Sequence, residues 1–366
     1  MNYESTVESP GRELTTRGHQ LDVAVDDPIV SARNVSVTFD MERGASRVLD
    51  DVSMDIGRDE ILGIVGESGS GKSMFASALL DAIVEPGILD GDITYYPTPD
   101  DPVELLDLSF ADLKRYRWAE LSMVFQGAMS SFNPTMKLRG HFEETLDAHN
   151  ASYTAGMDRA RELLSDLYLD PDRVLDSYPH ELSGGMKQRA LIALSMVLEP
   201  QVLVMDEPTA ALDLLMQRSI LQMLEEVKRK YDFTLVFITH DLPLVAELAD
   251  RLAVMYAFEF VEVGPTDELL ADAAHPYTRS LLNATPNMRT PLEEMRPIAG
   301  SSPDPVNVPT GCSYHPRCSL ADTQCREVPP DYHEVRSDHR VKCFHWEHAR
   351  EEIPFTLTAT PEDRDE

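Results

Sequence analysis

The chain has 366 residues, with 64 Asp and Glu against 32 Lys and Arg, so its formal net charge is −32. A field this negative repels DNA and RNA, and no basic stretch offsets it, so the composition argues against a nucleic-acid partner. Hydrophobic residues make up 42% of the chain, which is enough for a large core and argues against global disorder.

The basic residues are unevenly chosen, with 7 Lys against 25 Arg. An acidic, lysine-poor surface is typical of cytoplasmic proteins from salt-loving microbes, because carboxylates retain water and cations when salt screens their mutual repulsion. We therefore expect a salt-adapted, halophilic protein, with an ordinary acidic protein as the alternative.

Neither a membrane span nor a secretion signal is predicted. The longest clean apolar run, Leu252–Phe258, is far shorter than the roughly 20 residues that cross a bilayer. The first residues, MNYESTVESPGRELTTRGHQ, lack the basic and apolar regions of a signal peptide. We therefore expect a protein that stays in the cytoplasm.

Composition divides the chain into an α/β domain, a small extension and two tails. Residues 1–27 and 353–366 lack periodicity and are expected to be loose, the second of them acidic. Residues 28–285 are predicted to form an α/β domain with a largely parallel sheet and a helical subdomain at about 104–190. Residues 286–352 are rich in Pro and Cys and predict a separate small module. The expected strands include Val35–Phe39, Ile61–Val65, Val202–Met205 and Thr234–Thr239.

The strongest local signal is GESGSGKS, which follows the apolar run Ile61–Val65 and precedes the helix-like run MFASALLDAIV. This order of strand, loop and helix is the context of a phosphate-binding loop. Its glycines let backbone N–H groups surround phosphates, Lys72 would reach the β and γ phosphates, and Ser73 would bind Mg²⁺. The predicted ATP-binding residues of this loop are Gly66, Glu67, Ser68, Gly69, Ser70, Gly71, Lys72 and Ser73.

A pair of carboxylates lies in the later segment VLVMDEPT. Asp206 ends an apolar strand, where it can hold Mg²⁺, and Glu207 beside it is a candidate base for the attacking water. A solvated turn is the alternative for such a pair, but the phosphate loop upstream makes that alternative weak. The two motifs together predict Mg²⁺-dependent hydrolysis of a nucleotide.

Between these two motifs lies LSGGMKQR, which resembles the signature motif of ATP-binding cassette (ABC) proteins. The resemblance implies a P-loop nucleotide-binding domain with an antiparallel β subdomain and a helical subdomain. In that family two such domains stack head to tail, so Ser183, Gly184 and Gly185 would cap the γ-phosphate held by the loop of a partner.

Four further residues match the family at single positions. Gln126 in MVFQ resembles the glutamine that contacts Mg²⁺ and the attacking water, and His240 in VFITHD resembles the switch histidine. Asp213 in AALD resembles the aspartate of the loop between the two ATP sites, and Phe39 in NVSVTF matches the aromatic residue that stacks on adenine. The resemblance therefore implies Glu207, His240 and Gln126 as the catalytic residues.

The resemblance extends to one branch of the family. The segments FQGAMSSFNPTMKLRG and YPHELSGGMKQR resemble the ATPases of oligopeptide, dipeptide and nickel importers. AHPYTRSLL and PIAGSSPDPVNVPTGCSYHPRC resemble their C-terminal extension, so the resemblance covers about residues 29–347. Two departures are Gly127-Ala128 in place of an acidic residue and proline, and AFEFVEVG in the last strands of the core. The first lies near the expected contact with the membrane partner.

The resemblance implies an ATPase subunit that drives import of peptides from the cytoplasmic face of the cell membrane. Its expected partners are two integral-membrane permeases, a second ATPase that is commonly a different chain, and indirectly an extracellular solute-binding protein. Nickel, a sugar or another solute is an alternative cargo. A soluble cassette ATPase of DNA repair, chromosome structure or translation is a further alternative, which the short stretch between Ser73 and Leu182 and the negative charge oppose.

All the cysteines fall in the predicted extension, with the spacing C-x5-C-x6-C-x17-C for Cys312, Cys318, Cys325 and Cys343. The segment is too polar to build much core, so a staple is expected, and disulfides are disfavoured in a reducing cytoplasm. Four thiolates suit zinc or an iron–sulfur cluster, although the tight C-x2-C pairs of zinc sites are absent and His315 or His345 could substitute. Four unrelated buried thiols are the remaining alternative. The resemblance to peptide-importer ATPases favours a [4Fe–4S] cluster over zinc.

Overall fold

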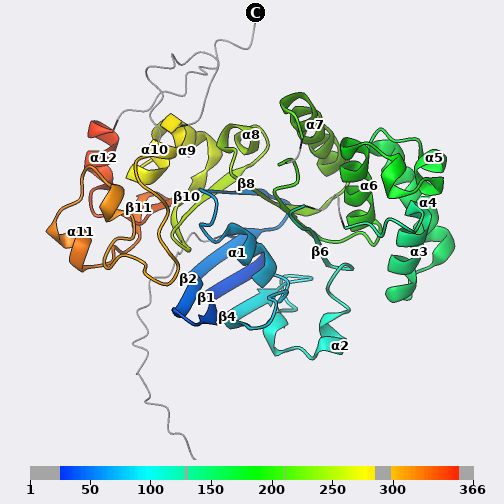
Figure 1. Cartoon of the computed structure of the whole chain (residues 1–366), viewed down its shortest axis with the longest axis horizontal. Coiled ribbons are helices and arrows are strands. Elements are labelled where there is room, and N and C mark those ends of the chain that lie inside the picture. Colours follow the sequence, from blue (N-terminus) through cyan, green and yellow to red (C-terminus); the bar gives the residue numbers. More distant parts are fainter. Residues whose placement is uncertain (1–24, 128–130, 211, 285–297, 354–366) are drawn as a thin grey trace, which may run out of the picture.

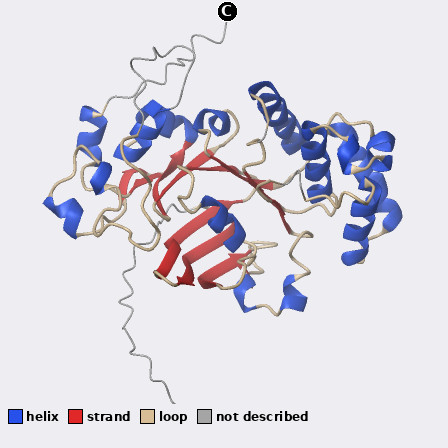
Figure 2. Cartoon of the chain, viewed as in Figure 1, coloured by secondary structure: helices blue, strands red, loops and turns tan. Residues whose placement is uncertain are grey.

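The structure is a computed structural model that describes residues 25–127, 131–210, 212–284 and 298–353. Nearly all of the two tails predicted at 1–27 and 353–366 lies outside the described residues. Two β-sheets with helices around them form the body of the molecule (Figure 1). Figure 2 shows that the strands gather in the centre and that helices lie at both ends of the long axis.

The smaller sheet is antiparallel. Strands β1 (Pro28–Met41) and β2 (Gly44–Gly57) form a long hairpin, and β4 (Gly87–Tyr95) and β5 (Val103–Glu104) extend it in the order β2-β1-β4-β5. Buried residues alternate with more exposed ones in the middle of β1, which is typical of a strand with one face on the core. The antiparallel β subdomain implied by the family resemblance is confirmed.

The larger sheet has the order β11-β12-β10-β9-β3-β8-β7-β6. The neighbouring strands β9, β3, β8, β7 and β6 are parallel to one another, whereas β10, β12 and β11 are antiparallel strands at one edge. The parallel strands are mostly apolar and are buried along their whole length, because both faces of the sheet are covered. This confirms the predicted α/β class. The bounds are β3 (Ile61–Val65), β6 (Leu121–Val124), β7 (Val202–Asp206), β8 (Thr234–Thr239), β9 (Arg251–Tyr256), β10 (Glu259–Pro265), β11 (His333–Arg336) and β12 (His339–Val341).

The helices pack against the two sheets. Helix α1 (Lys72–Ala78) shares one apolar cluster with residues of both sheets. Part of the region predicted as helical, about 104–190, lies at the right of Figure 1, and the region also contributes β6, a core strand that its helical pattern did not indicate. The other described helices between α1 and position 246 are η1 (Leu105–Asp107), α2 (Phe110–Leu113), α3 (Leu138–Ala148), α4 (Tyr153–Asp166), α5 (Pro171–Asp176), η3 (Pro179–Glu181), α6 (Gly184–Met196), α7 (Leu214–Lys230) and α8 (Leu242–Ala246).

The C-terminal part continues the larger sheet. Strand β12 pairs with β10, so β11 and β12 of the predicted extension belong to the sheet that carries the phosphate loop. Figure 1 shows this part at the opposite end of the long axis from α3, α4 and α5. Its helices are α9 (Thr266–Asp272), α10 (Pro276–Ala284), η4 (His315–Arg317), α11 (Thr323–Glu327) and α12 (Trp346–Glu352). The shared sheet fixes the position of the cysteine segment relative to the nucleotide loop.

Candidate nucleotide-binding site

The predicted phosphate loop connects β3 to α1. Gly66, Gly69 and Gly71 have positive φ angles of 156°, 80° and 111°. A Cβ atom on Gly66 would lie 2.1 Å from the carbonyl oxygen of Met255, so no other residue fits that position. Gly71 precedes the first residue of α1, and the loop therefore presents its amides at a helix N-terminus, where an anion is favoured.

Lys72 begins α1, and its side chain bends back over the loop. Its Nζ donates to the carbonyl oxygens of Gly66 and Glu67, both at 2.9 Å, and the residue is only 4% exposed. Burial lowers the pKa of Lys72, whereas the nearby Glu207, Asp206 and Glu67 raise it. The ammonium group thus lies inside the loop on carbonyl partners that phosphate oxygens can replace.

Asp206 ends β7 and is 3% exposed. Burial raises the pKa of Asp206, while a hydrogen bond from Ser73 lowers it. Within the described residues its Oδ1 has no hydrogen-bond partner. A buried carboxylate oxygen without a partner, beside a serine hydroxyl, fits Mg²⁺, which prefers oxygen ligands. Ser73 and Asp206 are therefore the residues that would hold the ion.

Glu207 lies between the two other predicted catalytic side chains. Its Oε2 accepts a hydrogen bond from Gln126 Nε2 at 3.2 Å, and its Oε1 lies 3.1 Å from His240 Nδ1. The backbone of Glu207 has a left-handed φ of 46°, which its own N–H stabilises by donating to the carbonyl of Ile238. The fold therefore brings three residues from the ends of different strands to one point.

A pocket of about 330 Å³ joins the loop to this carboxylate. Its lining includes three loop residues, the candidate base and switch residue, and one residue of α10, namely Gly66, Glu67, Ser68, Glu207, His240 and Leu281. The volume is at the lower end of the range for small-molecule sites. A phosphate held by the loop would lie in the same cavity as Glu207.

The signature residues lie at other helix N-termini. Ser183 caps α6, with its hydroxyl accepting from the N–H of Met186 at 3.3 Å, and Asp213 caps α7 by accepting from Met216 at 3.0 Å. Ser183, Gly184 and Asp213 are exposed, whereas Gly185 is buried, and a Cβ there would lie 2.3 Å from the Met216 side chain. None of these four lines the pocket described above.

Phe39, predicted to stack on adenine, lies on β1 and is half-buried. Its ring packs on Gly87 of β4, where a Cβ atom would lie 2.7 Å from the ring. Phe39 is not among the residues that line the pocket, so its contact with adenine stays a prediction.

In the described part of the chain beyond position 261, the phosphate loop contacts Tyr277, Ser302 and Arg317, and the sequence patterns did not indicate them. The N–H of Glu67 donates to the Tyr277 hydroxyl at 2.8 Å, and Arg317 and Ser302 donate to the Glu67 carboxylate. Arg317 directly precedes Cys318 in HPRC, and this position beside a cysteine was the only feature of the sequence that could have drawn attention to Arg317. The C-terminal part thus touches the nucleotide site.

The four cysteines lie near one another as free thiols. Burial, together with the nearby charges of Glu259, Cys318 and Cys325, raises the pKa of Cys312 to about 12. Cys343 interacts electrostatically with all three other thiols, and Cys318 with Cys325. In the part of the chain that the structure describes, no three cysteine sulfurs lie within 4.8 Å of one another.

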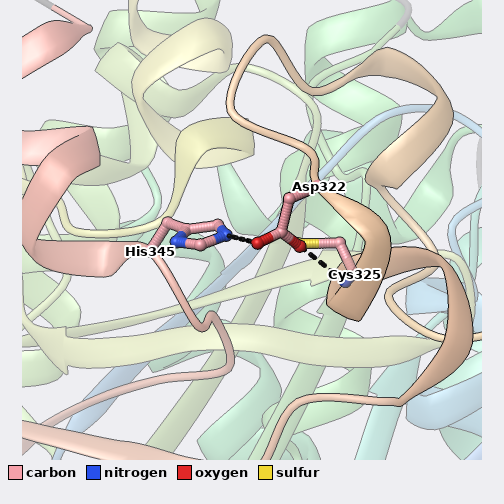
Figure 3. Close-up of side chains that lie close together, drawn as sticks. All are labelled: Asp322, Cys325 and His345. Carbon is pink, nitrogen blue, oxygen red and sulfur yellow. Dashed lines mark hydrogen bonds and ion pairs between the residues drawn. The ribbon is translucent and has the colours of Figure 1, made fainter.

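One tight group of ligand atoms includes a cysteine, as Figure 3 shows: Asp322, Cys325 and His345. Asp322 accepts a hydrogen bond from the N–H of Cys325 at 3.0 Å, and His345 Nε2 lies 3.1 Å from the Asp322 carboxylate. The backbone N–H of His345 also donates to the sulfur of Cys343 at 3.3 Å. By contrast, the ring of His315 contacts the Cys312 carbonyl at 3.0 Å. Of the two predicted substitute histidines, His345 belongs to this group.

None of the helices in the described ranges is both long and apolar enough to cross a membrane.

Comparisons with known proteins agree with this geometry. Residues 49–210 match the family described as ABC transporter, and residues 261–325 match the oligopeptide/dipeptide transporter C-terminal region. The dimeric ABC transporter cassette MJ0796 superposes with a TM-score of 0.56 at 26% identity, covering 65% of this chain and 98% of that one.

Curated relatives match nearly end to end. The chain is 38% identical to the dipeptide transport ATP-binding protein DppD of Caldanaerobacter subterraneus, over 88% of this chain and 98% of that one. It is 36% identical to DppD of Bacillus subtilis (87% and 95%) and 35% identical to the oligopeptide transport ATP-binding protein OppD of Haemophilus influenzae (83% and 93%). The chain therefore belongs to the ATP-hydrolysing subunits of ABC transporters, in the group that carries the oligopeptide/dipeptide transporter C-terminal region.

Proposed function

We propose that this chain hydrolyses ATP to drive the import of peptides. The observation that carries the proposal is the presence of two features in one chain. A pocket joins a phosphate loop to Glu207, and a C-terminal region of the oligopeptide/dipeptide transporter type follows it. The names of relatives that match over almost their whole length support peptides over nickel or other solutes as cargo.

In the proposed site, residues 66–73 surround the phosphates of ATP. Lys72 exchanges its carbonyl partners for phosphate oxygens, and Phe39 stacks on adenine. Mg²⁺ would be held by Ser73 and Asp206 with Gln126 beside them, and when bound it neutralises charge on the β and γ phosphates. The unpaired Oδ1 of Asp206 supports this assignment.

In the proposed hydrolysis step, Glu207 accepts a proton from the attacking water. Gln126 and His240 each contact one of its carboxylate oxygens, so the side chain is oriented before ATP arrives. His240 is 58% exposed, which leaves it free to follow the γ-phosphate, whereas Glu207 is 13% exposed. Orientation by two neighbours is what a general base requires, because misplacement slows proton transfer.

We infer that the working unit contains two cassettes. The side chains of Ser183 and Asp213 are exposed and each accepts from one backbone N–H of its helix, and neither residue lines the pocket of its own chain. A head-to-tail partner would place its ATP against Ser183, Gly184 and Gly185, because a helix N-terminus attracts phosphate. The second ATPase is proposed to be a different chain.

The proposed transporter also contains two integral-membrane permeases. A solute-binding protein outside the cell delivers the peptide to them. The chain would lie at the cytoplasmic face of the membrane, with Gln126 and the helical region 104–190 toward the permeases, and residues 286–352 forming the extension. The exposed Phe125 beside Gln126 supports a contact there.

Reconstitution tests this function. The chain should be co-purified with candidate permeases and a candidate second ATPase and placed in vesicles with a peptide-binding protein. Peptide-dependent uptake that requires ATP is expected. Uptake of Ni²⁺ without uptake of peptide would overturn the cargo, and ATP hydrolysis that never depends on the permeases would overturn the transport role.

We further propose that the four cysteines hold a [4Fe–4S] cluster. Four thiolates on a single zinc ion would lie about 3.8 Å apart, given a Zn–S bond of about 2.3 Å. The four sulfurs interact electrostatically yet are not packed that tightly, which suits a cluster in which each cysteine binds a different iron. The raised pKa values mean that binding must release protons from the thiols.

Metal analysis of anaerobically purified protein tests the cluster. About four irons per chain and absorbance near 400 nm are expected. One zinc per chain would overturn the cluster and favour a zinc site at Asp322, Cys325 and His345. In that case Asp322→Ala should release the zinc. No bound metal at all would overturn both metal assignments and leave four free thiols.

We also propose that the negative charge is a salt adaptation. Its support is the net charge of −32 and the preference for arginine over lysine.

A further inference from the structure

Glu67 of the phosphate loop is held from three sides by residues of the C-terminal region. Its N–H donates to the Tyr277 hydroxyl at 2.8 Å. Its carboxylate accepts two hydrogen bonds from Arg317, at 2.6 and 3.0 Å, and one from the Ser302 hydroxyl at 3.3 Å. The loop between β3 and α1 is therefore anchored to a part of the chain that lies more than 200 positions away.

Arg317 is fixed independently of Glu67. Its side chain is 5% exposed, and its Nε donates to the carbonyl of Ala299 at 2.6 Å. The guanidinium lies 5.7 Å from the ring centre of Tyr256 and 5.9 Å from that of Tyr314, and these rings pack on Tyr277. An arginine held this way presents its two N–H groups to a carboxylate with little entropy left to lose.

The ion pair matters to the nucleotide because of where Glu67 lies. Glu67 lines the pocket together with Gly66 and Ser68, and its carbonyl oxygen accepts from Lys72 Nζ at 2.9 Å. An unpaired carboxylate at this position would add a negative charge beside a triphosphate. Hydrogen bonding to Glu67 raises the pKa of Arg317, so the arginine keeps its charge.

We propose that Arg317 is a positioning residue of the ATP site, through which the C-terminal region sets nucleotide affinity. It cancels the charge of Glu67 and holds the loop in the conformation that receives phosphate. The inference rests on ATP binding at this loop. Arg317 directly precedes Cys318, so the clamp and the cysteine segment share one stretch of chain.

A double-mutant cycle on the full chain tests the proposal, with affinities for fluorescent ATP and ADP analogues as the readout. Arg317→Gln should weaken ATP binding by about tenfold, which corresponds to ~1.4 kcal/mol, and ADP binding less, because ATP carries more negative charge. Glu67→Gln combined with Arg317→Gln should bind ATP more tightly than Arg317→Gln alone, because the unpaired carboxylate is gone. Molar KCl should shrink the defect by screening.

Two further variants separate this role from a loss of folding. Arg340→Gln removes an ion pair with Glu334 in the same region, away from the loop, and should leave ATP affinity within about twofold of wild type. Arg317→Lys retains the charge without the two-pronged geometry and should recover part of the lost affinity. Thermal unfolding of each variant identifies proteins that fail to fold. If Arg317→Gln is one of them, the ATP affinity of Arg317→Lys is compared with wild type instead.

Three results would overturn the proposal: wild-type ATP affinity in folded Arg317→Gln, a double variant that binds no more tightly than Arg317→Gln, or an equal loss in Arg340→Gln. Failure of the wild-type chain to bind ATP would instead refute the function on which the proposal rests. In the assembled transporter, the KM for ATP should rise in Arg317→Gln while kcat changes little.

Discussion

Replacing Glu207 with glutamine removes the candidate base and little else. The amide oxygen can still accept from Gln126 Nε2, now 3.2 Å from the carboxylate, and the amide N–H can donate to His240 Nδ1. The two side chains have the same shape, so the pocket and the left-handed backbone at position 207 should persist. What is lost is the ability to take a proton from water.

The size of the effect follows from that loss. Removing a positioned general base costs about 10²–10⁴-fold in rate, which is ~3–5 kcal/mol of activation free energy. ATP affinity should hardly change, because the proposed phosphate contacts from Lys72 and the loop amides remain in place. A slow rate with normal binding is therefore the expected signature.

Single-turnover hydrolysis of labelled ATP by the assembled transporter measures the rate, and a fluorescent ATP analogue measures affinity. Lys72→Ala is the contrasting variant, since it should lose binding as well as turnover. A Glu207→Gln protein that binds ATP normally and hydrolyses it within about tenfold of wild type would refute the assigned role.

Three other expectations follow from the same structure. Ser183→Asp preserves the α6 cap but places a negative charge against the partner's γ-phosphate, so this variant should block cooperative ATP hydrolysis. Ser183→Asn is a neutral cap and should retain cooperative hydrolysis. Equal activity of the two variants would exclude contact between Ser183 and phosphate. If the charge of −32 is a salt adaptation, the melting temperature should rise between dilute buffer and molar KCl, and an unchanged melting temperature would rule that out. Burial lowers the pKa of His275 to about 4, so around and below pH 6.5 the unfolded chain binds more protons at this residue than the folded chain does. The contribution of His275 to the free energy of unfolding should therefore fall by ~2 kcal/mol from pH 7 to pH 5, measured by urea unfolding of wild type and His275→Asn. A His275→Asn variant with the same pH dependence as wild type would contradict this.

The local sequence pattern was enough to predict the α/β class and the phosphate loop. The run Ile61–Val65 is a buried parallel strand, and the glycines of GESGSGKS take the positive φ angles that a tight loop before a helix requires. These features depend on neighbours in the sequence, because backbone sterics and apolar runs act over a few residues. Strand β6 was not indicated, since only its pairing with β7 makes Leu121–Val124 a strand.

Long-range packing decided the geometry of the site. Gln126, Glu207 and His240 are far apart in sequence, and the ends of β6, β7 and β8 bring them to one carboxylate. The resemblance implied their roles, but only the strand order supplies the distances of 3.1 and 3.2 Å between them. Carboxyl ends of adjacent parallel strands meet at one sheet edge, and that edge is a tertiary property.

The contact between the C-terminal region and the phosphate loop was beyond any local pattern. In the sequence, Arg317 is a basic residue beside a cysteine and Glu67 is a polar loop residue, and neither position indicates a partner. In the fold, the guanidinium of Arg317 lies near the Tyr256 and Tyr314 rings, which pack on Tyr277. Sequence alone thus predicted which residues would bind ATP and hydrolyse it. Tertiary packing decided which distant residue neutralises Glu67, because an ion pair between segments exists only where the fold removes water and fixes both partners.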